Sequence, residues 1–269
     1  MTDLKTVAIN IRQGIVKQIS NAASGHPGGS LSGVEILTLL YFEVMNIDPK
    51  DPKNPDRDKF VLSKGHASPL LYATLAERGY FDKDELLTFR KINSRLQGHP
   101  DMKNTPGVDM TTGSLGQGIS AAVGMAIAGK LDEKDAKVYA LLGDGELAEG
   151  IVWEAAMSAS HFNLDNLVAF VDYNGLQIDG RCCDVMNSDP IDSKFAAFNW
   201  NVINVEDGHD FEQLREGLSK IVQGKPNVLV CKTIKGKGIS FMEDQAGWHG
   251  SAPNEEQTKQ ALTELGGTL

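Results

Sequence analysis

Apolar residues recur near the start of the chain at the spacing of an amphipathic helix, at Val7, Ile11, Ile15 and Ile19. Further along, short apolar runs without polar alternation end in glycine, aspartate or asparagine, as buried strands do. The glycine-rich run 24–29 predicts a loop after the first helix. The patterns predict helices over residues 2–24, 31–45, 119–131, 149–161 and 211–222 and strands over 60–62, 138–142, 167–171, 199–205 and 226–231.

The order strand, helix, strand occurs twice in the second half of the chain, over residues 138–171 and 199–231. Such units build a parallel sheet with helices on its faces. We therefore expect an α/β fold with a doubly wound, mostly parallel sheet flanked by helices, in a single domain over residues 1–269. From residue 247 onward the chain is polar, which predicts a surface extension (247–269) with one last helix.

Composition limits the class of protein. The 269 residues, 41% of them hydrophobic, can form one domain with its own core. No apolar run reaches the roughly 18 residues that span a membrane, and the start lacks a signal peptide, so we expect a cytoplasmic protein without membrane contact. A net charge of -10 argues against a nucleic-acid partner. The three cysteines fit neither a disulfide framework nor a CxxC metal site, and we expect reduced thiols.

Two polar residues follow neighbouring strands of the predicted sheet. Asp144, in the sequence Gly-Asp-Gly, and Asn174 lie thirty residues apart, each just past the carboxyl end of a strand. Ligands of open α/β sheets bind at those ends. Carboxylate and amide oxygens suit Mg²⁺, and equally Ca²⁺ or Mn²⁺. Either motif alone is more often a simple turn, but the pair separated by a strand-helix-strand unit favours a metal site.

Glycines beside these residues favour a bound diphosphate. Gly143 and Gly145 let the backbone turn sharply, and the next helix offers free N–H groups to an anion. A second glycine-rich run, 112–118, precedes the helix at 119–131 and is consistent either with a phosphate cradle or with close helix packing. Residues 124–130 match the start of a P-loop only formally, because they fall inside a predicted helix and the required hydroxyl is missing.

Five of the six histidines lie next to a glycine, and no pair has zinc-binding spacing. A histidine in such a loop can project into a cleft and carry a proton near neutral pH. For any single one a solvated or backbone-bonded side chain is the more common role, but the group favours a shared polar site. The five are His26, His66, His99, His209 and His249.

The motif from Gly143-Asp144-Gly145 to Asn174 resembles the thiamine-diphosphate signature. The resemblance implies that Asp144, Asn174 and the main-chain oxygen of Leu176 bind the metal. Many members have two asparagines where this chain has Tyr173-Asn174, but the liganding position is kept.

Longer segments, including SGHPGGSLSGVEIL, FVLSKGHASPLLYA, LQGHPD and TTGSLGQGISAAVGMA, resemble transketolases in the same order, from about residue 10 to 256. The resemblance implies that Gly113, Ser114, Leu115 and Gly145 contact the cofactor. His66 and His249 would lie near its diphosphate and the reacting carbonyl, and His26 and His99 would contact sugar hydroxyls. His26, His99 and His249 would shuttle protons, whereas His161 and His209 are expected to be structural.

Transfer of a two-carbon ketol unit between sugar phosphates, with thiamine diphosphate and a divalent metal, is the activity that the resemblance implies. The expected context is carbohydrate metabolism such as the pentose phosphate pathway. A full-length transketolase continues into domains that carry further site residues, so we expect the partner to be a separate C-terminal transketolase subunit, in an α₂β₂ assembly. Two alternatives stay open: an enzyme similar to 1-deoxyxylulose-5-phosphate synthase, and a noncatalytic regulatory subunit.

Overall fold

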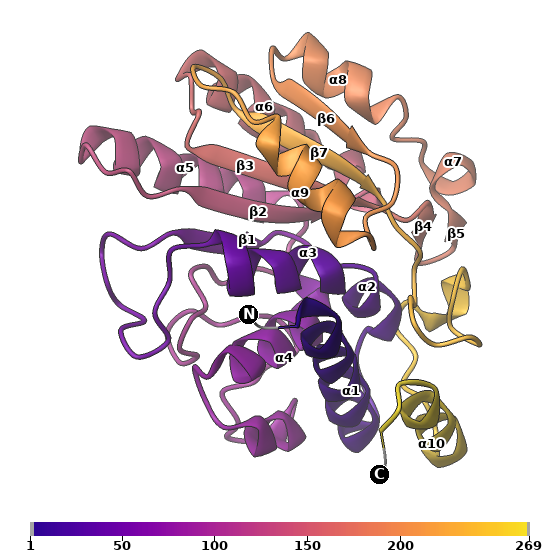
Figure 1. Ribbon diagram of the computed structural model, residues 1–269. Coiled ribbons are helices and arrows are strands. Elements are labelled where there is room, and N and C mark those ends of the chain that lie inside the picture. The colour runs from indigo at the N-terminus through magenta and orange to yellow at the C-terminus, as the bar shows by residue number, and fades with distance from the viewer. Residues whose placement is uncertain (1–2, 268–269) are drawn as a thin grey trace.

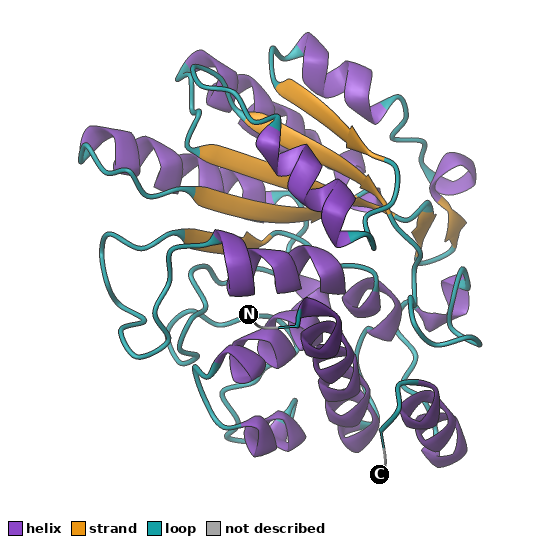
Figure 2. Ribbon diagram, viewed as in Figure 1, coloured by secondary structure: helices purple, strands orange, loops and turns teal. Residues whose placement is uncertain are grey.

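The computed structural model describes residues 3–267, so the predicted helix start at residue 2 and the last two residues of the predicted extension lie outside it. Five parallel strands form one sheet in the order β1-β2-β3-β7-β6. A two-residue antiparallel pair, β4 with β5, stands beside it (Figures 1 and 2). The strands are β1 (Lys59–Leu62), β2 (Val138–Gly143), β3 (Leu167–Tyr173), β4 (Leu176–Gln177), β5 (Gly180–Arg181), β6 (Asn201–Val205) and β7 (Asn227–Lys232).

Helices cover both faces of the sheet, which confirms the predicted doubly wound α/β fold (Figure 1). One face packs against α1, α3, α4 and α9, and the other against α5, α6 and α8. The α-helices are α1 (Leu4–Ala22), α2 (Pro27–Leu31), α3 (Val34–Leu39), α4 (Ser68–Arg78), α5 (Gln117–Leu131), α6 (Gly150–His161), α7 (Cys182–Val185), α8 (Ile191–Ala197), α9 (Phe211–Ser219) and α10 (Glu255–Glu264).

Side chains of the central strands alternate between the two cores. In β2, Leu141 packs into the core beneath α1 and α4, whereas Ala140 and Leu142 pack into the core beneath α5 and α6. Both sets are buried, which explains why the strands appear in the sequence as unbroken apolar runs. Within residues 3–267, no helix is both long enough and apolar enough to cross a membrane.

Several predicted elements differ in extent from the observed ones. The expected loop at 24–29 includes the start of helix α2, which Pro27 begins at its first position. The expected helix over 31–45 is α3 followed by a π-helical turn, η1 (Leu40–Val44). Helices α4 and α8 were not predicted. For α4 the reason is that it is buried nearly all round, so its sequence has no polar stripe at helical spacing.

The predicted surface extension packs closely on the domain. Ala261 and Leu262 of α10 are buried in the same core as α1, and Gln13 of α1 donates a hydrogen bond to the Leu265 carbonyl at 3.0 Å. Residues preceding α10 also reach the carboxyl edge of the sheet, where His249 lines a pocket. This segment therefore joins the fold at two places.

Candidate functional site

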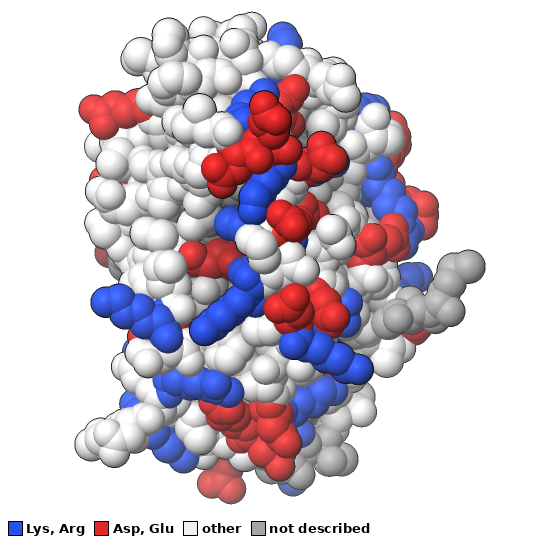
Figure 3. All heavy atoms as spheres, turned by 90° about the vertical axis from the view of Figure 1, so that its left-hand side faces the viewer, with Lys and Arg blue, Asp and Glu red and all other residues white. Residues whose placement is uncertain are grey.

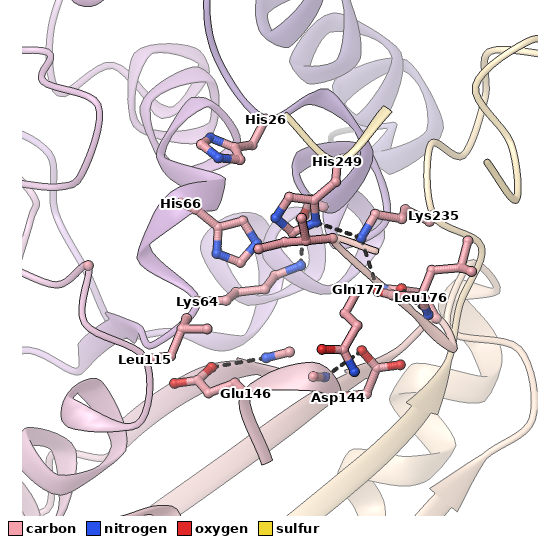
Figure 4. A pocket seen from close by; sticks show the side chains of 16 residues that line it. His26, Lys64, His66, Leu115, Asp144, Glu146, Leu176, Gln177, Lys235 and His249 are labelled. Carbon is pink, nitrogen blue, oxygen red and sulfur yellow. Dashed lines mark hydrogen bonds between the residues drawn. The ribbon is translucent and has the colours of Figure 1, made fainter. Parts of the chain in front are cut away.

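A pocket of about 230 Å³ opens at the carboxyl ends of β2 and β3, where the sequence predicts a ligand site. Figure 4 shows three histidines on one side of it, two acidic residues at the strand ends on the other, and two lysines between them. Its lining residues are His26, Gly29, Lys64, His66, Gly113, Leu115, Gly143, Asp144, Gly145, Glu146, Asn174, Leu176, Gln177, Ile178, Lys235 and His249.

Asp144 and Asn174 come together because β2 and β3 are parallel neighbours in the sheet. The Asp144 carboxylate accepts hydrogen bonds from the Gly175 N–H at 2.5 Å and the Gly145 N–H at 2.8 Å. Burial and the charge of Asp172 raise the pKa of Asp144 to about 6. Within residues 3–267, Asp144 forms no ion pair that would favour its ionised form. A bound divalent cation would stabilise the buried carboxylate in that form.

Hydrogen bonds also fix the amide of Asn174. Its nitrogen donates to Asp172 Oδ2 at 3.2 Å, and its oxygen accepts from the Leu176 N–H at 3.1 Å. No three His, Cys, Asp or Glu side chains gather into a metal site in the described part of the chain. The Asp144 carboxylate, the Asn174 amide oxygen and the Leu176 carbonyl would instead give an all-oxygen donor set, which would fit a hard cation such as Mg²⁺.

Three of the predicted histidines form a cluster at the pocket (Figure 4). The ring centroids of His26 and His66 lie 5.3 Å apart, those of His26 and His249 5.5 Å, and those of His66 and His249 5.1 Å. Burial, assisted by neighbouring cations, lowers the pKa of His26 to about 4 and that of His249 to about 3. Burial and the charge of Lys64 lower the pKa of His66 as well. The cluster is therefore neutral at pH 7 and can donate and accept hydrogen bonds.

Two predicted site residues, Ser114 and His99, do not line this pocket. His99 lies beside it, since a Cβ added to Gly113 would come within 3.1 Å of the His99 ring. Burial and the charge of Arg90 lower the pKa of His99. His99 thus lies next to Gly113, which lines the pocket.

Sequence reasoning gave no role to Lys64, a buried residue that lines the pocket, or to Asp172, which is fully buried and pairs with it. The Lys64 ammonium contacts the Asp172 carboxylate and donates to the Gly29 carbonyl at 2.6 Å. Asp172 also accepts hydrogen bonds from the hydroxyls of Ser32 and Thr233. Lys64 lies in the FVLSKGHA segment that carries the family resemblance, but only the fold shows that it pairs with Asp172.

Lys235 was also missed, because it lies in a basic run, 232–238, and such runs are more often solvated loops. Its side chain is buried and its ammonium donates to the Leu176 carbonyl at 3.0 Å and contacts His249 Nδ1 at 3.0 Å. Burial lowers the pKa of Lys235, which nearby Asp144 opposes. A buried ammonium facing glycine-rich turns favours an anionic ligand.

Glu146 joins the two glycine-rich turns of the pocket. Its carboxylate accepts hydrogen bonds from the Gly116 N–H at 2.8 Å and the Gly143 N–H at 3.1 Å, and a third from the Ser63 hydroxyl. The Ser63 oxygen in turn accepts from the Ile119 N–H at the start of α5. Glu146 thereby holds the 113–116 turn against the Gly-Asp-Gly turn.

Residues 124–130, the formal P-loop match, lie inside α5, which confirms their rejection as a phosphate loop.

Comparison with known proteins agrees with this geometry. Residues 4–268 match the family profile described as "Transketolase, thiamine diphosphate binding domain". The chain is 46% identical over 265 residues, 98% of its length and 96% of the relative's, to the "6-deoxy-6-sulfo-D-fructose transketolase subunit SqwG" of Clostridium sp. (strain MSTE9). It is 45% identical, with the same coverage, to one subunit of the apulose-4-phosphate transketolase of Actinobacillus succinogenes. The structure of the transketolase from Leishmania mexicana superimposes with a TM-score of 0.93 at 36% identity, covering 100% of this chain and 42% of that one.

Proposed function

The chain belongs to the transketolase family as an N-terminal, thiamine diphosphate-binding subunit, and we propose the following roles for its pocket. Asp144, Asn174 and the Leu176 carbonyl hold a divalent metal, with Mg²⁺ as the expected ion. Gly113, Ser114, Leu115 and Gly145 contact the cofactor, as do His66 and His249. The observation that carries the proposal is the convergence of these oxygen donors with two buried ammonium groups and glycine-rich turns at one edge of the sheet.

Charge complementarity supports this assignment. The Lys235 ammonium and the backbone N–H groups of residues 113–115 would hold a diphosphate, whose remaining charge the metal offsets. Leu115 offers an apolar contact at the same pocket. When bound, thiamine diphosphate supplies the carbon–carbon bond chemistry of ketol transfer.

The neutral histidines would bind the sugar and move protons. His26 has a buried Nδ1 without a hydrogen-bond partner in the described part of the chain, so it can bond a hydroxyl or carbonyl of a sugar. His249, beside the Lys235 ammonium, can accept a proton only weakly and is suited to polarise a substrate oxygen. His99, which lies next to Gly113, would contact hydroxyls of the sugar phosphate.

A C-terminal transketolase subunit is the partner that the relatives of equal length imply, and we propose an α₂β₂ assembly with it. Helix α5 carries polar side chains only at Gln117, Ser120 and Lys130, which is few for a helix that faces water. Leu131 at its end and Met157 of α6 are 79% and 59% exposed. Figure 3 shows a face whose charged groups gather at its centre and lower part and whose upper left is largely uncharged. We place the partner on the outer side of α5 and α6.

Ketol transfer measured with a panel of donors tests the proposal. The chain is assayed alone and with its partner subunit, with Mg²⁺ and thiamine diphosphate. The donors are xylulose 5-phosphate, which would support a pentose phosphate pathway role, and the 6-deoxy-6-sulfo-D-fructose and apulose 4-phosphate named for the relatives. Activity only in the mixture is expected. Activity of the chain alone would refute the need for a partner, and no activity with any donor would refute these substrates.

A further inference from the structure

A buried charged cluster lies outside the pocket, between helices α1 and α3 and the loop before α9. The Arg12 guanidinium forms a double hydrogen bond with the Glu35 carboxylate, at 2.7 and 2.9 Å. Glu35 Oε2 also contacts His209 Nδ1 at 2.9 Å. Burial opposes ionisation of Glu35, but the bond from His209 and the charge of Arg12 lower its pKa to about 2.

The second nitrogen of His209 bonds a different segment. His209 Nε2 accepts a hydrogen bond from the Ile234 N–H at 2.9 Å. Because a backbone N–H can only donate, Nε2 carries no proton, and the proton of the ring is on Nδ1, where it is donated to Glu35. Glu35 therefore sets the tautomer that lets His209 hold Ile234.

Arg12 bonds the same segment on its other side. Arg12 Nε donates to the Lys237 carbonyl at 3.0 Å, so the cluster forms hydrogen bonds with the backbone at residues 234 and 237. Lys235 lies between these two contacts. Its backbone carbonyl also accepts from the Asp244 N–H, and the Gly236 N–H donates to the Gly28 carbonyl, so the turn is held on several sides.

We propose that Arg12, Glu35 and His209 are positioning residues that hold the 234–237 turn so that the Lys235 ammonium reaches the pocket. The direct basis is that the two bonds flank Lys235, whose ammonium lies 3.0 Å from both the Leu176 carbonyl and His249 Nδ1. A buried ion pair adds little net stability compared with apolar residues, so stability alone does not account for the paired charges of Arg12 and Glu35 at this place. The benefit to cofactor binding rests on the function proposed for the pocket.

His249 reports the position of Lys235 without any cofactor. The imidazole nitrogen resonances of the full chain are recorded by NMR with ¹⁵N-labelled histidine, and the His249 signal is assigned from its loss in His249→Ala. Lys235→Met gives the signal expected when the ammonium is absent. His209→Ala removes the bond to Ile234, whereas His209→Gln keeps it, because the carboxamide supplies both an acceptor and a donor. Arg215→Ala on neighbouring α9, which loses only partly exposed ion pairs with Glu43 of η1 and Glu212 of α9, is the matched control.

In His209→Ala, the His249 Nδ1 signal is expected to move from its wild-type position to that of Lys235→Met, and to move no further in the double variant. His209→Gln and Arg215→Ala should keep the wild-type signal. A wild-type signal in a folded His209→Ala chain would overturn the proposal. If His209→Ala does not fold, Arg12→Lys, which retains the charge but not the bond from Nε to Lys237, gives the same test.

Cofactor affinity provides an independent measurement. With Mg²⁺ and the partner subunit, the dissociation constant of thiamine diphosphate is expected to rise about tenfold in His209→Ala and in Lys235→Met, and no further when the two are combined. Additive losses would show that His209 does not act through Lys235. If Lys235→Met left the affinity unchanged while the NMR signal still responded to His209→Ala, the role proposed for Lys235 would fail and the positioning by His209 would stand.

Discussion

The buried pair of Lys64 and Asp172 gives the sharpest test of how the pocket floor is held. Asp172→Asn is nearly isosteric but removes the negative charge from beside an ammonium whose side chain is 2% exposed. Lys64 would keep only neutral acceptors, the Gly29 carbonyl at 2.6 Å and the carboxamide oxygen of the new side chain. Breaking a buried pair from one side costs about 3–5 kcal/mol, because the remaining charge is left uncompensated. This is a large part of the roughly 5–15 kcal/mol that stabilises a typical domain.

Urea unfolding of the chain at 25 °C, followed by circular dichroism, measures this loss. Asp132→Asn, at an exposed position, is the matched control and should stay within about 0.5 kcal/mol of wild type. Burial opposes ionisation of Asp172, but the charge of Lys64 prevails and lowers its pKa. A carboxyl whose pKa is lowered by folding contributes stability above its unfolded pKa of about 3.9, and that contribution is lost only as pH falls through the folded value.

The deficit of Asp172→Asn should therefore be the same at pH 7 and at pH 5. A loss below about 1 kcal/mol would refute the reasoning, since it would mean that Lys64 tolerates the missing charge. A deficit that disappears at pH 5 would show instead that Asp172 is already protonated there.

Three further predictions concern the pocket. Asp144→Ala removes a charged ligand, so it should raise the dissociation constant for Mg²⁺ and thiamine diphosphate more than about 100-fold. The circular dichroism spectrum should stay unchanged. Unchanged affinity in calorimetry would refute the metal assignment. His26→Ala should retain cofactor affinity but lose about 10²- to 10⁴-fold in kcat, and full turnover would exclude His26 from the mechanism. Because folding lowers the pKa of His26 and His249 to about 4 and 3, the unfolded chain binds more protons below pH 6.5, so stability should fall as pH drops from 6.5 towards 4. His26→Asn should flatten that pH dependence in urea unfolding, and an equally steep curve would contradict the assigned pKa.

The sequence alone predicted the class of fold and one half of the site. Apolar runs without alternation require burial on both sides, which a parallel sheet between two helical layers provides. Asp144 and Asn174 follow two such runs joined by one crossover, so their proximity depends only on local chain order. The glycines beside them indicated close backbone approach for the same local reason.

The tertiary structure decided everything that depends on segments far apart in the chain. Lys64 pairs with Asp172 across 108 residues, and His249 reaches His26 and His66 only because the segment before α10 folds back over the carboxyl edge of the sheet. Helix α4 is buried nearly all round, so its sequence carries no periodic pattern. Whether Lys235 points into solvent or into the pocket depends on contacts with α1, α3 and the loop before α9. The periodicity and spacing of residues in the sequence indicate local burial, whereas packing between distant elements determines which group pairs with a buried charge.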